Sequence, residues 1–167
     1  MIAGLSIENF TILHVVISLI AIVSGLIVLV GMLGSRRLPG WTALFLATTV
    51  LTSVTGFMFP ISGLTPGIVF GLISVVVLVI ALIALYVKQL GDAWRWIYVT
   101  TALIALYLNV FVLIVQSFQK LPALHALAPT QSEPPFLIAQ AVALILFVVL
   151  GVVAVIRFHP DMVPRMS

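Results

Sequence analysis

Five long runs of apolar residues make up most of the chain, and short polar breaks separate them. Each run has about 19 to 24 residues, enough for an α-helix to cross a hydrocarbon core about 30 Å thick. The breaks contain glycine and proline, as in "GSRRLPG" and "PISGLTPG", which do not continue a helix easily. The pattern predicts an all-α integral membrane bundle, a single domain over residues 1–167, with five transmembrane helices at about Phe10–Leu33, Trp41–Phe59, Ile68–Val87, Trp96–Phe118 and Phe136–Ile156.

The composition places the chain among membrane proteins. Of its 167 residues, 63% are hydrophobic and 7% are charged, whereas about 25% of the residues of a soluble domain are charged. A water-soluble fold of this size could not hide so much apolar surface, so we expect a lipid bilayer around it. The few basic residues do not indicate a nucleic-acid partner. The lack of cysteine excludes disulfides, thiolate metal sites and thiol nucleophiles.

The basic residues predict how the chain lies in the membrane. An excess of lysine and arginine marks the cytoplasmic side of a membrane protein. This predicts an N-terminus outside the cell, a cytoplasmic C-terminus and a periplasmic loop at Gln119–Pro135. The first run follows Glu8 and Asn9 rather than a basic leader, so we expect an uncleaved span. Lys120 falls on one side of the five spans, and the other side carries Arg36, Arg37, Lys88, Arg95, Arg157 and Arg165.

Polar side chains within the predicted helices allow two interpretations. Asn109 and Gln116 are seven residues apart and share a helix face. The simpler interpretation is that such side chains hold helices together by hydrogen bonds. Because polar groups of four helices reach the same outer third of the membrane, they also predict a pocket open toward the periplasm. No Asp, Glu, Lys or Arg lies within a span, which singles out His14. The predicted pocket residues are His14, Ser18, Thr52, Thr55, Asn109, Gln116 and Gln140.

The predicted periplasmic loop, Gln119–Pro135, is the longest connection. It combines leucines with polar side chains, among them Lys120, His125 and Glu133, and its four prolines indicate a stiff segment. It is expected either to cover the pocket as an ordered lid or to lie on the bilayer surface.

Metal and haem sites are weaker alternatives. Glu8, His14, His125 and Glu133 all fall on the outer side and are suitable metal ligands, but no fixed spacing joins them. A haem held by two histidines would need His125 to fold inward and meet His14. No motif predicts a cofactor, although an apolar cleft with a few polar groups would also suit a quinone.

Four segments, "TSVTGFMFP", "GDAWRWIYV", "YLNVFVLIVQSFQKLP" and "APTQSEPPF", resemble an uncharacterised family of small polytopic bacterial inner-membrane proteins. The likeness covers nearly the whole chain and is most distinctive in the fourth helix and the loop after it. It implies location in the bacterial cytoplasmic membrane. Because that family has no assigned activity, the likeness implies no catalytic or binding residue.

The sequence therefore favours a non-enzymatic membrane protein that binds a ligand or serves as an accessory subunit of a larger membrane complex. Its expected partners are the lipid bilayer and either other membrane subunits or further copies of itself. One alternative is a haem-binding or metal-binding redox module that uses His14 and His125. Another is a small channel or transporter subunit, although the chain has neither an internal repeat nor a strongly polar pathway.

Overall fold

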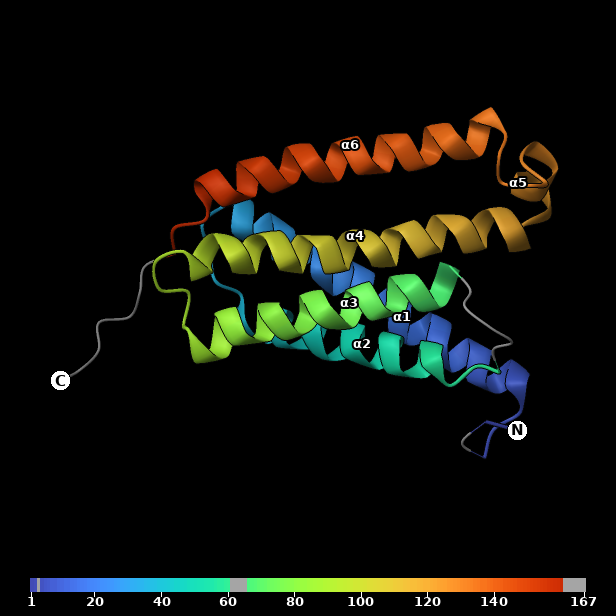
Figure 1. The fold of residues 1–167 in the computed structure, drawn as a ribbon, viewed down its shortest axis with the longest axis horizontal. Coiled ribbons are helices and arrows are strands. Elements are labelled where there is room, and N and C mark those ends of the chain that lie inside the picture. The colour runs from blue at the N-terminus through green and yellow to red at the C-terminus, as the bar shows by residue number, and fades with distance from the viewer. Residues whose placement is uncertain (3, 61–65, 161–167) are drawn as a thin grey trace.

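The structure is a computed structural model that describes residues 1–2, 4–60 and 66–160. The regular elements of these ranges are helices (Figure 1), and five of them are long and apolar enough to cross a membrane, as predicted. A five-residue π-helix, η1, continues α3, and the sixth α-helix, α5, is short. The elements in chain order are α1 (Ile7–Leu33), α2 (Pro39–Phe57), α3 (Pro66–Leu82), η1 (Ile83–Val87), α4 (Trp94–Lys120), α5 (Pro122–Leu127) and α6 (Pro134–Arg157).

The five long helices run up and down between two ends of the bundle (Figure 1). We call one the α5 end; it holds α5, the start of α1 and Lys120. We call the other the arginine end; it holds the loop between α1 and α2 and the end of α6. The sequence-predicted division of basic residues is therefore seen in space for those described, whereas Arg165 and the C-terminal tail from residue 161 lie outside the described residues. The basic side chains of the arginine end are Arg36, Arg37, Lys88, Arg95 and Arg157.

Local capping chemistry explains where the helices begin. The Ser6 side chain accepts a hydrogen bond from the backbone N–H of Asn9, which satisfies one of the free amides at the start of α1. This cap starts α1 at Ile7, before the apolar run itself. Proline occupies the first turn of α2, α5 and α6, where a missing N–H costs nothing.

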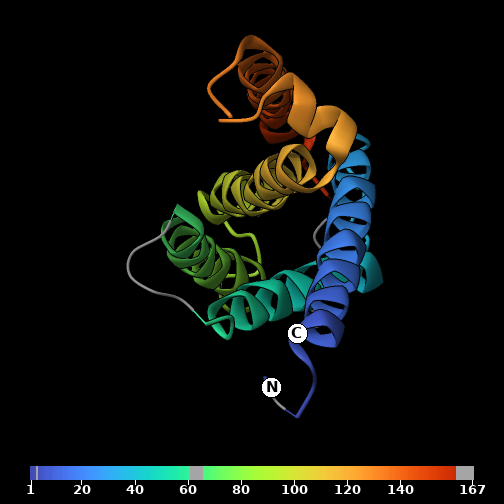
Figure 2. The same ribbon diagram turned by 90° about the vertical axis from the view of Figure 1, so that its right-hand side faces the viewer.

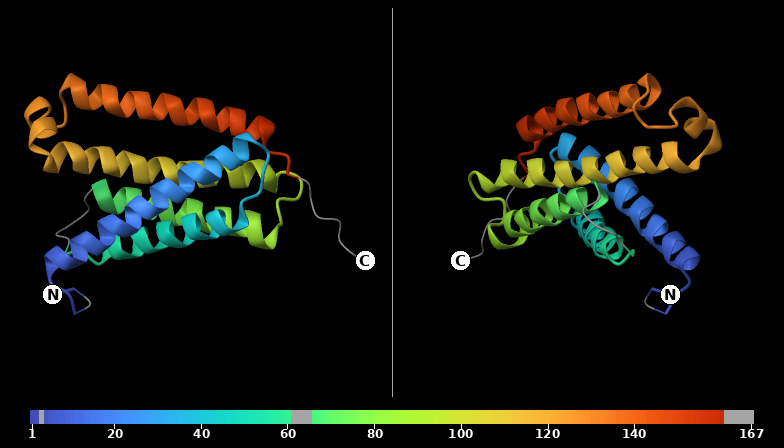
Figure 3. Two further views of the ribbon diagram at one scale, coloured as in Figure 1. Left: turned by 180° about the vertical axis from the view of Figure 1, so that it is seen from behind. Right: turned by 45° about the vertical axis from the view of Figure 1, so that its right-hand side comes forward.

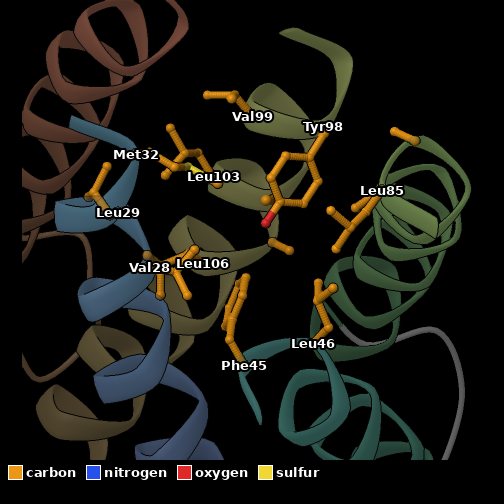
Figure 4. Close-up of a cluster of buried hydrophobic side chains, with 14 of the residues drawn as sticks. Val28, Leu29, Met32, Phe45, Leu46, Leu85, Tyr98, Val99, Leu103 and Leu106 are labelled. Atoms are coloured by element: carbon orange, nitrogen blue, oxygen red, sulfur yellow. The ribbon is translucent and has the colours of Figure 1, made fainter. Parts of the chain in front are cut away.

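The main hydrophobic core lies in the half of the bundle near the arginine end. It is built from the last turns of α1, the first turns of α2, the end of α3 with η1, and the first half of α4 (Figure 4). Gly25 is the closest point of approach: a Cβ there would lie 2.6 Å from Leu106 Cδ1 and 2.9 Å from the Phe45 ring. The absent side chain lets α1 pack directly against α2 and α4.

The α5 end is packed differently. From the crossing near Gly25, α1 runs away from α4 toward its own N-terminus, as the oblique view in Figure 3 shows. A small separate cluster of Phe118, Ala128 and Phe136 joins α4, α5 and α6 at this end. The helices are thus tightly packed at the arginine end and diverge toward the α5 end.

Helix α6 is the most peripheral long helix, with only 6% of its most apolar stretch buried. It packs on α4, where Tyr107 and Phe147 stack with ring centroids 5.6 Å apart. Its last turn is held by Arg95, whose Nη1 donates to the carbonyl oxygens of Val155 at 2.9 Å and Phe158 at 2.7 Å. These bonds satisfy carbonyls that the end of a helix otherwise leaves free.

Candidate functional site

His14 joins α1 to α2 near the α5 end. Its Nδ1 lies 2.7 Å from Thr55 Oγ1, and that hydroxyl is also 2.7 Å from the carbonyl oxygen of Leu51. Since a hydroxyl has one hydrogen and a carbonyl can only accept, Thr55 donates to Leu51 and accepts from His14. The proton of a neutral His14 ring is therefore on Nδ1, which leaves Nε2 as an acceptor. Phe59 packs against the imidazole edge with centroids 5.4 Å apart.

Asn109 joins α4 to α2. Its Nδ2 donates to Thr49 Oγ1 at 3.3 Å, and Thr49 itself is fully buried. Asn109 is half-buried, and within the described ranges its side chain makes this one hydrogen bond, through Nδ2, which leaves Oδ1 without a donor. Asn109 is thus both a link between helices and an unused acceptor.

Gln116 and Lys120 continue the Asn109 face of α4 at steps of seven and four residues, and we call these three residues the α4 polar face. Both Gln116 and Lys120 are exposed. In the described ranges the Gln116 amide has no hydrogen-bond partner. At this end of the bundle α1 diverges from α4 (Figure 3).

Gln140 belongs to α6 and contacts α4 at Phe111. Its Nε2 donates to the carbonyl oxygen of Phe111 at 3.3 Å, in the contact between α6 and α4. Its Oε1 is buried and has no partner among the described residues. A buried acceptor of this kind normally binds an ordered water or a ligand.

The predicted pocket residues therefore divide into two groups. His14 and Asn109 each bond to a threonine of α2, Thr55 and Thr49, whereas Gln140 lies where α6 meets α4. Ser18 and Thr52 bond to carbonyl oxygens of their own helices, His14 at 2.7 Å and Thr48 at 2.9 Å. That the residues of the first group bind a ligand stays a prediction.

The connection between α4 and α6 is ordered by its own hydrogen bonds. Gln131 donates from Nε2 to the carbonyl oxygen of Val115 at 2.8 Å. Viewed from the α5 end (Figure 2), α5 lies beside the ends of α4 and α6 and away from the start of α1. It therefore does not cover the start of α1. Leu121 and Leu127 are more than half exposed, which suits the second expectation, a segment lying on the bilayer surface.

Glu133 closes this connection. Its carboxylate accepts hydrogen bonds from Thr130 Oγ1 at 2.8 Å and from the backbone N–H groups of Thr130 and Ser132. Slight desolvation raises the pKa of Glu133, but these hydrogen bonds outweigh it, so the pKa falls below its ordinary value of 4.5.

The lowered pKa predicts a change at acid pH. A carboxyl whose pKa is lower in the folded protein stabilises the connection above its ordinary pKa, and this contribution is lost as the pH falls through the folded value. Hydrogen exchange at the Thr130 and Ser132 amides should therefore accelerate, relative to intrinsic rates, below about pH 4. Glu133→Gln should remove most of this pH dependence; a steep dependence that persists in the variant would contradict it.

The proposed metal ligands are not gathered into one site. Among the described residues, no group of three or more His, Cys, Asp or Glu side chains is placed to hold a metal ion. His14 lies on α1, whereas His125 is an exposed residue of α5. The inward fold that joint haem ligation needs is not present.

Sequence reasoning did not include Thr49, the α2 partner of Asn109, among the pocket residues. Thr48, Thr49, Thr52, Ser53 and Thr55 make α2 rich in hydroxyl groups, but the sequence does not reveal which of them turns toward α4. No protein-family model, no curated protein and no solved structure matches the chain.

Proposed function

We propose that the chain is a non-enzymatic protein of the bacterial cytoplasmic membrane whose α4 polar face binds a ligand or a partner subunit. The five apolar helices support membrane insertion. The clustering of described arginines supports a cytoplasmic arginine end and a periplasmic α5 end. The likeness of four segments to bacterial inner-membrane proteins supports the choice of membrane.

The observation that carries the proposal is the unused hydrogen-bonding capacity of the α4 polar face. Asn109 lies about 16 Å from the end of α4 at 1.5 Å per residue, a depth at which lipid tails offer no donor. Its Oδ1 acceptor and the Gln116 amide lack partners within the described ranges. A bound molecule with a polar group on an apolar body, such as a quinone or a lipid-like compound, would complete these bonds; so would a polar side chain of a neighbouring subunit.

Site-specific photocrosslinking in native membranes tests the proposal. A photoreactive residue at Gln116 should give a discrete product, a protein band for a subunit or a fixed mass increase for a small ligand. The matched control is Ile104, which is 38% exposed on the same helix and does not share the polar face. A photoreactive residue at position 104 should crosslink only to bulk lipid. Identical products at the two positions would contradict a specific site.

The side chains themselves give a second prediction. Gln116→Leu should leave membrane insertion intact, because it makes α4 more apolar. It should remove the specific crosslink when the photoreactive residue is placed at the neighbouring position Leu113. A crosslink of unchanged yield would mean that Gln116 only helps the helices to pack.

The redox alternative has one supporting feature, the acceptor Nε2 of His14, but among the described residues no group of three or more metal-ligating side chains includes it. A Soret band or stoichiometric metal in purified protein, lost in His14→Leu, would favour it over the α4 polar face. No contact in the described chain favours the channel alternative over the others.

A further inference from the structure

A small cleft opens at the arginine end, far from the α4 polar face. It has a volume of about 70 Å³. It lies between the last turns of α1, the start of α2, η1 and the chain that follows α6. Its wall is apolar on one side and cationic on the other, with the side chains of Val28, Met32, Leu85, Phe158, Arg36 and Arg37.

Arg36 and Arg37 differ from their basic neighbours. Arg95 is bound to two carbonyl oxygens, and the Lys88 ammonium lies 5.4 Å from the Trp94 ring. In the part of the chain that the structure describes, no carboxylate or carbonyl binds the guanidinium groups of Arg36 and Arg37. Their charges are therefore available to an anion.

The loop that carries the two arginines is folded back against α1. The Arg36 N–H donates to the carbonyl oxygen of Gly31 at 2.8 Å, and Ser35 adopts the left-handed region at φ 54°. A Cβ on Gly31 would lie 2.7 Å from Leu38 Cδ1 and 3.2 Å from the Arg36 carbonyl oxygen. Gly31 is thus needed for the close approach that places both arginines at the cleft.

The start of α2 also lines the cleft. No side chain caps this helix, and its first intrahelical bond is from Thr42 N to the Leu38 carbonyl, 2.8 Å. Leu38, Pro39 and Thr42 from this first turn line the cleft. The positive end of the helix dipole reinforces the two guanidinium charges.

The opposite wall has irregular backbone. There α3 changes into η1, and Leu90, which lines the cleft, has a positive φ of 61°. A π-helical turn and a residue other than glycine with a left-handed backbone are both energetically unfavourable. Such features are found most often at functional sites.

We propose that this cleft binds the phosphate of an anionic phospholipid. The phosphate oxygens would accept from Arg36 and Arg37, which suit phosphate geometry through their paired N–H groups. About 70 Å³ has room for a headgroup phosphate but not for a whole lipid, so the acyl chains would lie outside, along the apolar helices. The mixture of an apolar wall and cationic groups selects a lipid over free phosphate. The proposal does not depend on the α4 polar face.

Native mass spectrometry of the detergent-purified full chain tests it. Titration with phosphatidylglycerol should show one high-occupancy bound lipid, and phosphatidylcholine should bind more weakly. Arg36→Gln with Arg37→Gln should weaken phosphatidylglycerol binding about 10-fold or more, since each basic residue near anionic lipid contributes. The matched control is Arg157→Gln, an exposed arginine of the same end that does not line the cleft. It should change binding less than about 2-fold.

Neutralising two arginines also weakens the charge bias that orients the protein in the membrane. A second variant controls for a change of orientation. Arg36→Lys with Arg37→Lys keeps the charge but loses the paired N–H geometry, and should weaken binding about 3-fold. The proposed phosphate site would be contradicted if Arg157→Gln weakened phosphatidylglycerol binding as much as the double glutamine variant does. It would also be contradicted if phosphatidylcholine bound as tightly as phosphatidylglycerol. Displacement of the lipid by millimolar inorganic phosphate would overturn the lipid as its occupant.

Discussion

Gly25→Ala is expected to destabilise the protein by about 1–3 kcal/mol, although alanine is the better helix former. The added Cβ would lie 2.6 Å from Leu106 Cδ1 and 2.9 Å from two atoms of the Phe45 ring. The leucine can rotate away, but the phenylalanine ring is 1% exposed and sits inside the main core. α1 would have to move away from α2 and α4. Unfolding by titration with a denaturing detergent in mixed micelles measures the change.

Gly151→Ala is the matched control for this substitution. A Cβ at Gly151 would meet Leu103 Cδ1 at 3.6 Å, which is an ordinary van der Waals contact. It should leave the stability unchanged or raise it slightly, because alanine favours the helix. Equal stabilities of the two variants would contradict the close crossing of α1, α2 and α4.

Arg95→Met is the second substitution with a large expected effect. The variant would lose both bonds to the end of α6 and leave the carbonyl oxygens of Val155 and Phe158 unsatisfied. Hydrogen bonds to charged groups contribute about 1.5–3 kcal/mol, so a loss of about 2 kcal/mol or more is expected. Since α6 is hardly buried elsewhere, hydrogen exchange should accelerate in its last turns before the rest of the bundle unfolds.

Arg157→Met is the control that tests whether loss of a positive charge at the arginine end is enough to destabilise α6. Arg157 is exposed at the end of α6 and belongs to the same cationic end. Its substitution should leave exchange in α6 within experimental scatter. A loss of stability equal to that of Arg95→Met would show that the two carbonyl contacts contribute little.

The spans could be predicted from the sequence because an apolar run of about 20 residues has few alternatives to a membrane-length helix. The residues at which the helices begin and end were harder to predict. α1 starts before its apolar run, because Ser6 caps it and polar residues continue the helix. The short helix α5 and the π-helical turn η1 leave no periodic pattern long enough to recognise.

The sequence could predict how deep the polar side chains of the candidate site lie in the membrane, but not which neighbouring helix each of them faces. Residue counting places His14, Asn109 and Gln140 at definite heights along their helices. It does not tell which face of α4 meets which neighbour. The structure turns Asn109 toward Thr49 of α2, whereas Gln140 reaches the carbonyl of Phe111 from α6. Distances between helices depend on their crossing angles, which a single chain's pattern does not encode.

The cleft at the arginine end was hidden from sequence reasoning for a related reason. Arg36 and Arg37 served there only as markers of the cytoplasmic side. Their second property is that they line a partly apolar cleft and have no side-chain partner among the described residues. That cleft depends on Leu85 and Phe158, which are far away in the chain. The uneven packing also emerged only in three dimensions: the arginine half contains the main core, and the α5 half diverges (Figures 3 and 4).

The proposed function depends most on the orientation of the bundle, with the α5 end outside the cell. Because the chain contains no cysteine, single cysteines can be labelled without background. Gln119→Cys at the α5 end and His159→Cys at the arginine end replace exposed residues and keep every lysine and arginine. A membrane-impermeant maleimide should label Gln119→Cys in intact spheroplasts and His159→Cys only after lysis. Labelling of His159→Cys in intact spheroplasts, with Gln119→Cys protected until lysis, would contradict the orientation and the periplasmic site with it.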